Sequence, residues 1–429
     1  MGTGRARPGT PGRIGLALAG GGFMGAAYEL GALCALAESI DGLDLTRLDT
    51  YVGVSAGAFI AAGLVNGVSA HRMVRMFVED GDVETDFDPA LMLRPAYREW
   101  RRALRSAPSG LGASVGAGLS EALLGPQAVL WRTIERGLRL LPNGLVDGSP
   151  AERKLAQLLS QPGRTNDFRR TRVPLRIVAT DIDTGDPVEF GSPGHDHVPI
   201  SRAAIASSAV PGLFAPVRIG TRHYLDGALN KTVHASVALD YGVGLVLCVN
   251  PLVPYQAMQA GARRVSRSGI STVMAQTIRT AIRSRMSVGL AKYRVTHPGS
   301  DVVLFEPRRD DADTFFTNIF SLSSRRRLCE HAYRPPAPTC SSGTRHSIRC
   351  CAATGCRSTS ACCGIRRRGW CANCAPIRAG PSRAPPPRSI GWDTRSTTST
   401  ARSASSRRAR PAARPEEPRH AAKAAAAHP

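Results

Sequence analysis

Alternating strand-like and helix-like segments from residue 14 to about residue 305 predict an α/β sandwich. Two local patterns support this fold class. A strand-like segment at residues 13–19, apolar after Arg13, leads through a glycine-rich turn into a helical stretch over residues 26–38. A second apolar run, Tyr51-Val52, leads through a serine-containing turn into a small-residue helix over residues 58–65. With 429 residues, 42% of them hydrophobic, the chain is long enough to bury a substantial core.

The second turn has the pattern G-x-S-x-G, with Ser55 between Gly53 and Gly57. Such an elbow exposes the serine hydroxyl on a sharp strand-to-helix turn, and its glycines let strand and helix close without a clash. The amides at the start of the following helix favour developing negative charge. Because the pattern is short, an ordinary turn between strand and helix remains an alternative interpretation.

The first turn contains four glycines, Gly20, Gly21, Gly22 and Gly25. Successive glycines after a strand let backbone amides converge on one point, as in an oxyanion hole.

The same glycines spell G-x-G-x-x-G, so a dinucleotide-binding turn is the rival interpretation. That motif needs an acidic residue at the carboxyl end of the second strand. Asp41 and Asp44 stand at about the right distance, but they fall in the loop before that strand, which disfavours the nucleotide hypothesis.

A third pattern, Asp226-Gly227-Ala228, follows two short strands predicted at residues 217–219 and 223–225. An aspartate at a strand end followed by glycine can direct its carboxylate into a cleft. The plainer alternative is a turn aspartate.

In this order, the glycine loop, the serine elbow and the Asp-Gly-Ala motif resemble the patatin-like phospholipases, and residues 179–185 and 204–214 resemble two further segments of that family. The resemblance covers roughly residues 13–334. It implies a three-layer sandwich with a mostly parallel central sheet, carrying a helical insertion as cap or lid.

The resemblance also implies a function: hydrolysis of phospholipid or other acyl esters by a serine–aspartate dyad, with no cofactor and no metal. Ser55 would attack the ester, Asp226 would accept its proton, and the amides of the glycine loop would hold the oxyanion. A partly buried Asp226 would be a better base, because burial raises a carboxyl pKa. The family usually has Lys or Arg where this chain has Met24, so the main-chain donors of the oxyanion hole remain but a nearby positive charge is lost. Phe23 and Met24 are expected to pack in the core or to line an acyl channel.

Two alternatives remain. An α/β-hydrolase esterase with a Ser–Asp–His triad needs a histidine after the acid, but the candidates, His195, His197, His234 and His297, are interpreted as surface-loop residues. The other alternative is a catalytically weak or inactive relative that keeps the fold and binds membranes.

The domain organisation predicted from composition is a disordered arm at residues 1–12, a hydrolase domain at 13–334 and a basic tail at 335–429. Residues 84–149 interrupt the alternation as a helical cap, including a helix over about 127–141 that either packs on the core or docks on a membrane. A helix over about 271–295 is expected to be an ordinary amphipathic helix.

No apolar run is long enough to cross a bilayer and no secretory signal is recognised, so a cytoplasmic location with peripheral membrane contact is expected. Cys34 and Cys248 lie in apolar stretches and are expected to be reduced core residues, which fits a reducing compartment.

The tail carries 17 Lys and Arg against three Asp and Glu, eight of the 11 cysteines, and no Leu, Val, Phe, Met or Tyr. Three interpretations compete: a disordered basic arm, a metal module built on Cys371 and Cys374, and an out-of-frame translation, which the composition favours. No specific nucleic-acid binding is predicted.

Overall fold

The computed structural model describes residues 9–79, 94–97, 99–101, 143–257, 262–317 and 323–334. Within these ranges the strands form one eight-stranded sheet. They are β1 (Thr10–Leu18), β2 (Thr50–Val54), β3 (Leu175–Asp181), β4 (Pro187–Phe190), β5 (Val217–Ile219), β6 (Arg222–Asp226), β7 (Val243–Val249) and β8 (Asp301–Phe305).

The described helices are α1 (Gly22–Ser39), α2 (Ala56–Val65), α3 (Ala70–Phe77), α7 (Ser149–Leu159), α8 (Ile200–Ser207), α9 (Ala235–Leu239), α10 (Ile270–Thr296), α11 (Ala312–Phe316) and α12 (Arg325–Tyr333). Short 3-10 helices are η2 (Phe168–Arg170), η3 (Gly227–Leu229) and η4 (Val265–Arg267).

The sheet is mixed, with the order β5-β6-β3-β2-β1-β7-β8 and β4 also paired to β3. Strands β3, β2, β1, β7 and β8 are parallel to one another, whereas β4, β5 and β6 form the antiparallel part at the β3 end. This confirms the predicted α/β class and the mostly parallel sheet.

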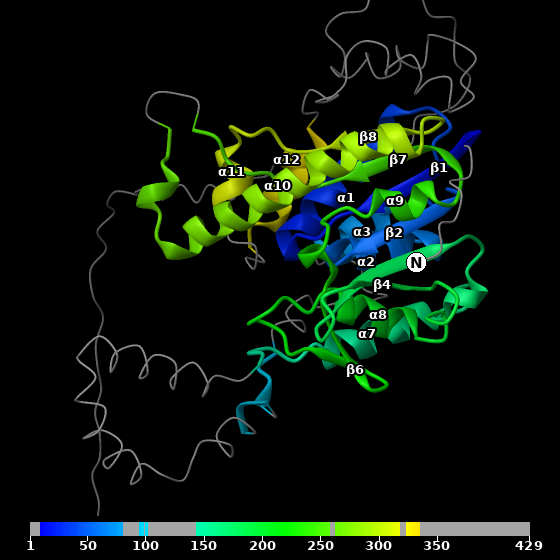
Figure 1. Ribbon diagram of the computed structural model, residues 1–429, viewed down its shortest axis with the longest axis horizontal. Helices are drawn as coiled ribbons and strands as arrows, with labels where there is room; N and C mark the ends of the chain where they lie inside the picture. Colours follow the sequence, from blue (N-terminus) through cyan, green and yellow to red (C-terminus); the bar gives the residue numbers. More distant parts are fainter. Residues whose placement is uncertain are drawn as a thin grey trace, which may run out of the picture. The chain divides into compact units, whose positions relative to one another are not determined.

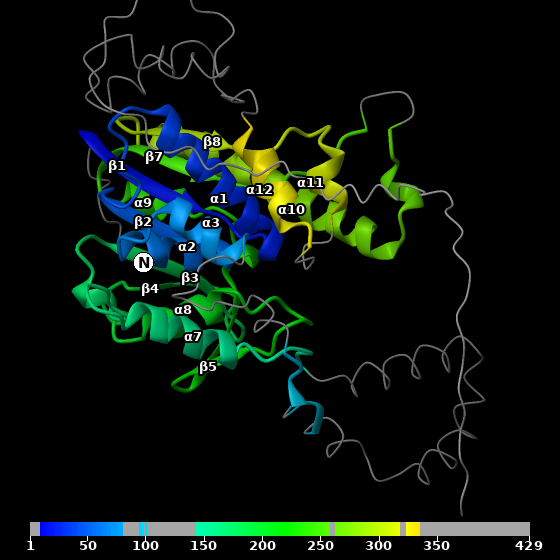
Figure 2. The same cartoon turned by 180° about the vertical axis from the view of Figure 1, so that it is seen from behind.

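Helices cover both faces of the sheet because its central strands are apolar on both sides. Residues on one face of β1, β2 and β7, such as Ala17, Val52 and Val246, pack with α9 and with part of α10. The alternate residue Leu18 faces α2, whose Gly57 lies against it. Figure 1 shows α9 and α10 in front of the sheet, and Figure 2 shows α1 and α12 on the opposite side. The predicted three layers are therefore present.

Helix α12 docks closely on α1. A Cβ added at Gly31 would lie 2.2 Å from the carbonyl oxygen of Cys329, so only glycine fits there. Leu328, Cys329 and Ala332 are buried at this contact. Residues near the end of the described chain therefore belong to the same core as the first helix.

Helix α10 differs from the simple amphipathic helix that was expected. Met286, Leu290 and Tyr293 are partly buried against the core, but most of its other large apolar side chains are exposed, with Ile270 at 83% and Val295 at 81%. The sequence pattern failed here because apolar residues lie on more than one side of the helix.

Two predicted segments fall mainly outside the described residues. The cap at residues 84–149 is described only at 94–97, 99–101 and 143–149, where Pro95 and Val146 form a bridge, so the helix expected over 127–141 lies outside. The tail at 335–429 also lies outside. The arm expected at residues 1–12 is too long, because β1 begins at Thr10. In the described part of the chain, no helix combines the length and hydrophobicity needed to span a membrane.

Candidate active site

Ser55 stands at the junction of β2 and α2, on the sharp turn that the pentapeptide predicts. Its backbone has φ 52° and ψ −121°, and among the described residues no other non-glycine residue has a positive φ. Such a conformation costs of order 1–3 kcal/mol and persists only when its surroundings enforce it. Strain at this one residue is characteristic of a functional site.

The flanking glycines make this turn possible. A Cβ at Gly57 would lie 2.6 Å from the carbonyl oxygen of Ala19, and a Cβ at Gly53 would lie 2.6 Å from the Cα of Ala58. The amide of Gly57 also donates to the carbonyl of Ala19 at 3.0 Å. A side chain at either glycine would therefore prevent the close packing between β2, α2 and the end of β1.

Strand β3 brings Ser55 and Asp226 together. β2 runs parallel to β3 and ends with Val54 opposite Val178, whereas β6 runs antiparallel to β3 and ends with Asp226 opposite Ala179. Strand β4 pairs with residues 177–180 of β3, which overlap the residues paired with β2 and those paired with β6, so β4 occupies the opposite edge of β3. Strands β2 and β6 therefore follow one another along a single edge of β3, and their last residues meet there. The ends of β2 and β6, which are far apart in sequence, therefore lie next to each other.

The last residue of α8 and the turn after it hold Ser55 and Asp226 in place. The amide of Ser55 donates to Ser207 Oγ at 2.8 Å, and that hydroxyl donates to the carbonyl of Val178 at 2.6 Å. Two residues later, the carbonyl of Ala209 accepts from the amide of Asp226 at 3.0 Å. This turn lies in the segment that resembles the family, but the sequence alone assigned it no role.

Asp226 is buried, with 5% of its surface exposed. Burial raises the pKa of its carboxyl to about 6, although hydrogen bonds from the Ala228 amide, at 2.8 Å, and from the Ser55 side chain lower it in part. The carboxyl is therefore a stronger base than an exposed aspartate and lies beside the Ser55 hydroxyl. Its burial agrees with the expectation, whereas the narrow apolar cleft stays a prediction.

The glycine loop lies against Ser55. A Cβ at Gly20 would stand 3.1 Å from Ser55 Cβ, and Gly22 has a φ of +61° that favours glycine. In the described part of the chain, no protein group accepts a hydrogen bond from the amides of Gly20, Gly21 or Gly22. These amides, together with that of Ala56 at the start of α2, are donors available to a ligand next to Ser55.

Gly25 does not fit the oxyanion role predicted for it. Its amide donates to the carbonyl of Gly21 at 2.9 Å within the first turn of α1, so that donor is already engaged. A Cβ there would lie 3.2 Å from Pro251. The glycine is explained by close packing instead.

Glu29 is a site feature that the sequence did not reveal. It is fully buried on α1, and its Oε1 accepts the amide of Ala19 at 2.8 Å, immediately before the glycine loop. Its Oε2 has no protein partner among the described residues, and burial raises its pKa well above the usual range. The sequence could not predict this contact, because a glutamate in an apolar helix can be exposed or buried depending on how the helix packs.

The histidines do not complete a triad. His234 is buried, not on the surface as predicted; burial lowers its pKa to about 4, and its ring interacts with the backbone of Gly227 and Lys231. His297 is also buried, and it contacts Asp240 at 3.1 Å. His195 packs against the edge of Phe190, and His197 is exposed. No hydrogen bond joins any of these rings to Ser55 or Asp226 in the described ranges.

The dinucleotide hypothesis finds little support, and the metal site weighed at Cys371 and Cys374 lies outside the described residues. Asp41 and Asp44 lie in the turn before β2, and Asp44 accepts from Thr46 at 2.7 Å and pairs with Arg47. The described residues contain no cluster of side chains suited to a metal ion. Cys34 and Cys248 are free and buried, as predicted.

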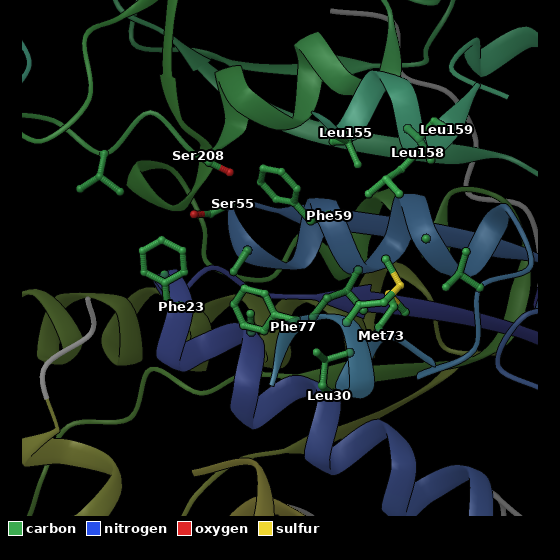
Figure 3. A pocket seen from close by; sticks show the side chains of 18 of the residues that line it. Phe23, Leu30, Ser55, Phe59, Met73, Phe77, Leu155, Leu158, Leu159 and Ser208 are labelled. Carbon is green, nitrogen blue, oxygen red and sulfur yellow. The ribbon is translucent and has the colours of Figure 1, made fainter. Parts of the chain in front are cut away.

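An apolar cavity of about 140 Å³ opens beside Ser55. Phe23 lines it and stacks on Phe77, with ring centroids 6.2 Å apart, whereas Met24 is buried elsewhere in the core. Figure 3 shows Ser55, Ser208 and Phe23 at one end of this cavity, with Met73, Leu158 and Leu159 toward the other. The nucleophile candidate therefore has an apolar cavity next to it.

The sequence matches the family described as patatin-like phospholipase over residues 16–239. Two solved structures show distant similarity. VipD from Legionella pneumophila is 16% identical with a TM-score of 0.34, and the match covers 76% of this chain and 66% of VipD. The type III effector ExoU is 19% identical with a TM-score of 0.31, and the match covers 84% of this chain and 54% of ExoU. The chain thus spans about two thirds of VipD and about half of ExoU, and the fold assignment rests on its own strand order.

Proposed function

Because the chain belongs to the patatin-like phospholipase family, we propose that it is a lipid acyl hydrolase that cleaves carboxylic esters through an acyl-enzyme on Ser55. The observation that carries the proposal is the convergence of the strained Ser55, which lines the apolar cavity, with the buried Asp226 carboxyl. The proposed substrate is a phospholipid or another acyl ester.

In the proposed first step, Ser55 Oγ attacks the ester carbonyl carbon while Asp226 accepts the hydroxyl proton. The carbonyl oxygen becomes an oxyanion, which the amides of the Gly20–Gly22 turn and of Ala56 stabilise. Collapse of this intermediate breaks the ester C–O bond, and the proton on Asp226 passes to the leaving alcohol. Water then attacks the acyl-enzyme with Asp226 again as base, which releases the fatty acid and restores the hydroxyl.

Replacing the nucleophile tests this proposal. The full chain, Ser55→Ala and Asp226→Asn are incubated with a p-nitrophenyl ester and with phospholipid in detergent micelles. Ser55→Ala should lower kcat by roughly 10⁴-fold or more, the scale seen when a serine nucleophile is removed. Equal rates for the wild-type chain and Ser55→Ala would exclude the mechanism.

Histidine variants separate the dyad from a triad. His234→Asn and His297→Asn should each keep activity within about tenfold of the wild-type rate, whereas loss of a triad base costs several orders of magnitude. Such a loss in either folded variant would favour the triad.

A further inference from the structure

The cavity beside Ser55 follows one face of helix α2. Phe59 and Gly63 come four and eight residues after Ser55, so all three lie on that face, and each contributes to the cavity lining. At 1.5 Å per residue, Gly63 lies about 12 Å along the helix from Ser55. A chain attached to Ser55 can therefore extend along α2.

The cavity has a limited capacity. Its volume of about 140 Å³ is close to that of an engineered cavity of roughly 150 Å³ that holds benzene, which has six carbons. An extended chain advances about 1.2 Å per bond, so about ten bonds cover the 12 Å to Gly63. Volume and length together indicate room for about six to ten carbons.

The far end is lined by side chains from two helices. Met73 of α3 places its Sδ 2.7 Å from where a Cβ of Gly63 would lie, so it fills the space that the glycine leaves. Leu158 and Leu159 of α7 line the same end (Figure 3). Arg164 also lines the cavity, and it donates to the carbonyl of Leu158 at 3.1 Å. A longer chain would have to displace Met73 or approach a guanidinium.

From this geometry we infer that the site takes medium-chain acyl esters of about six to ten carbons and that Met73 sets the upper limit. The inference rests on the proposed function, because it requires Ser55 to carry the acyl group. Met73 acts here as a specificity-determining residue, since it contacts the end of the chain and not the reacting atoms.

A competition between acyl chains of different length tests the limit. Esters with four, eight, twelve and sixteen acyl carbons are presented together to the full chain in the same detergent micelles, and each released fatty acid is quantified. The eight-carbon ester should exceed the sixteen-carbon ester by about tenfold or more in kcat/KM, the discrimination that an apolar pocket achieves against extra methylene groups. Equal rates for the two esters would overturn the inference, whatever the variants do.

Three methionine variants test whether Met73 sets the upper limit on acyl chain length. Met73→Ala should raise the relative rate of the longer esters until the preference falls to about threefold, whereas the volume-conserving Met73→Leu should keep the wild-type profile. Met286→Ala makes the same truncation in a separate small cavity under α10 and should also keep it. A folded Met73→Ala chain with an unchanged profile would remove Met73 from the role.

The Ser55→Ala chain distinguishes failure of the proposed function from failure of the chain-length inference alone. If Ser55→Ala hydrolyses every ester as fast as the wild-type chain does, the proposed function itself fails. If activity depends on Ser55 but not on chain length, only the chain-length inference fails.

Discussion

At the scale of single residues, the site depends on hydrogen bonds that the motifs do not contain. The amide of Ser55 has its acceptor in Ser207, and that hydroxyl is in turn anchored on Val178 of β3. Ser207 is fully buried and is not among the residues that line the cavity. The strained turn therefore owes its position to a buried serine from another helix.

Ser207→Ala should lower kcat by about 10- to 100-fold with little change in KM, because displacing a reacting group by about 1 Å costs up to 100-fold. Ser207→Thr keeps the hydroxyl and should recover much of the loss. Ser201→Ala is the matched control, a buried serine on α8 whose hydroxyl bonds Asn166. Steady-state kinetics with a soluble ester measures all three, and a rise in KM alone would argue against a positioning role.

The raised pKa of Asp226 gives the activity a pH dependence. The base must be deprotonated to accept the Ser55 proton, and burial brings its pKa to about 6. We therefore predict that kcat/KM falls about tenfold per pH unit below about pH 6 and is level above it. Asp226→Asn should lower kcat by about 10²- to 10⁴-fold and abolish this titration. A wild-type profile level down to pH 4 would contradict the assignment.

The raised pKa of Asp226 also makes the free energy of unfolding depend on pH, and here high pH is unfavourable. Raising the folded pKa from 3.8 to about 6 means that the protonated form is favoured in the fold. The associated stability is present below the unfolded pKa and is lost as pH rises through about 6, a change of about 3 kcal/mol at most.

Asp226→Asn should accordingly be more stable than the wild-type chain at pH 8, by about 1–3 kcal/mol in the free energy of unfolding, and the difference should shrink at pH 4. Asparagine keeps an oxygen that can accept the Ala228 amide, so the substitution removes the charge without removing that bond. Urea unfolding at both pH values provides the measurement; a variant less stable than wild type at pH 8 would mean that the ionised carboxylate is well solvated or paired.

Ser55 and Asp226 could be predicted from sequence because each belongs to a short motif with its own geometric logic. Glu29, Ser207 and the burial of His234 could not, since each depends on which distant segment covers the residue. The oxyanion role given to Gly25 was wrong for a related reason: the pattern cannot tell a free amide from one already engaged in the first turn of a helix.

At the scale of elements, the elbow and the glycine loop were predictable because they are local, from strand to turn to helix. The meeting of β2 and β6 on one edge of β3 was not, because it requires the register of three strands. The irregular exposure of α10 escaped prediction because periodicity reports which residues share a side, but not whether anything packs there.

Gly57→Ala tests how closely the elements approach at the elbow. The added Cβ would meet the backbone of Ala19 and Leu18 at 2.6–2.7 Å, and backbone cannot move aside as a flexible side chain can. We predict a loss of about 2–4 kcal/mol in the free energy of unfolding, near or above the usual overpacking cost.

The control for Gly57→Ala is Gly289→Ala in α10, where the nearest atom, on Tyr293, is 3.6 Å away. Here alanine should stabilise the chain by about 0.5–1 kcal/mol through helix propensity. Denaturant unfolding compares the two variants, and similar free-energy changes at both positions would refute the close approach at the elbow.

At the scale of the whole described molecule, the fold extends beyond the family match. That match ends at residue 239, yet β7 and β8 continue the sheet next to β1, and α12 packs on α1. The hydroxyl of Tyr333 also donates to Glu38 of α1 at 2.5 Å. Helix α12, which ends at Tyr333, therefore contributes to the core, and the domain end predicted at residue 334 stays a prediction.

Truncation separates this core from the residues that follow it. A chain ending at residue 334 should keep a cooperative thermal transition and ester hydrolysis within about threefold of the full chain, because all the described core contacts remain. A chain ending at residue 317 loses α12 and exposes the surface of α1 around Gly31, so it should lose the transition and the activity together. Gly31→Val makes the same test at full length, since its side chain would collide with the backbone of Cys329 and force α12 away. A chain ending at residue 317 that unfolds at the same temperature as the one ending at 334 would show that α12 is dispensable for the fold.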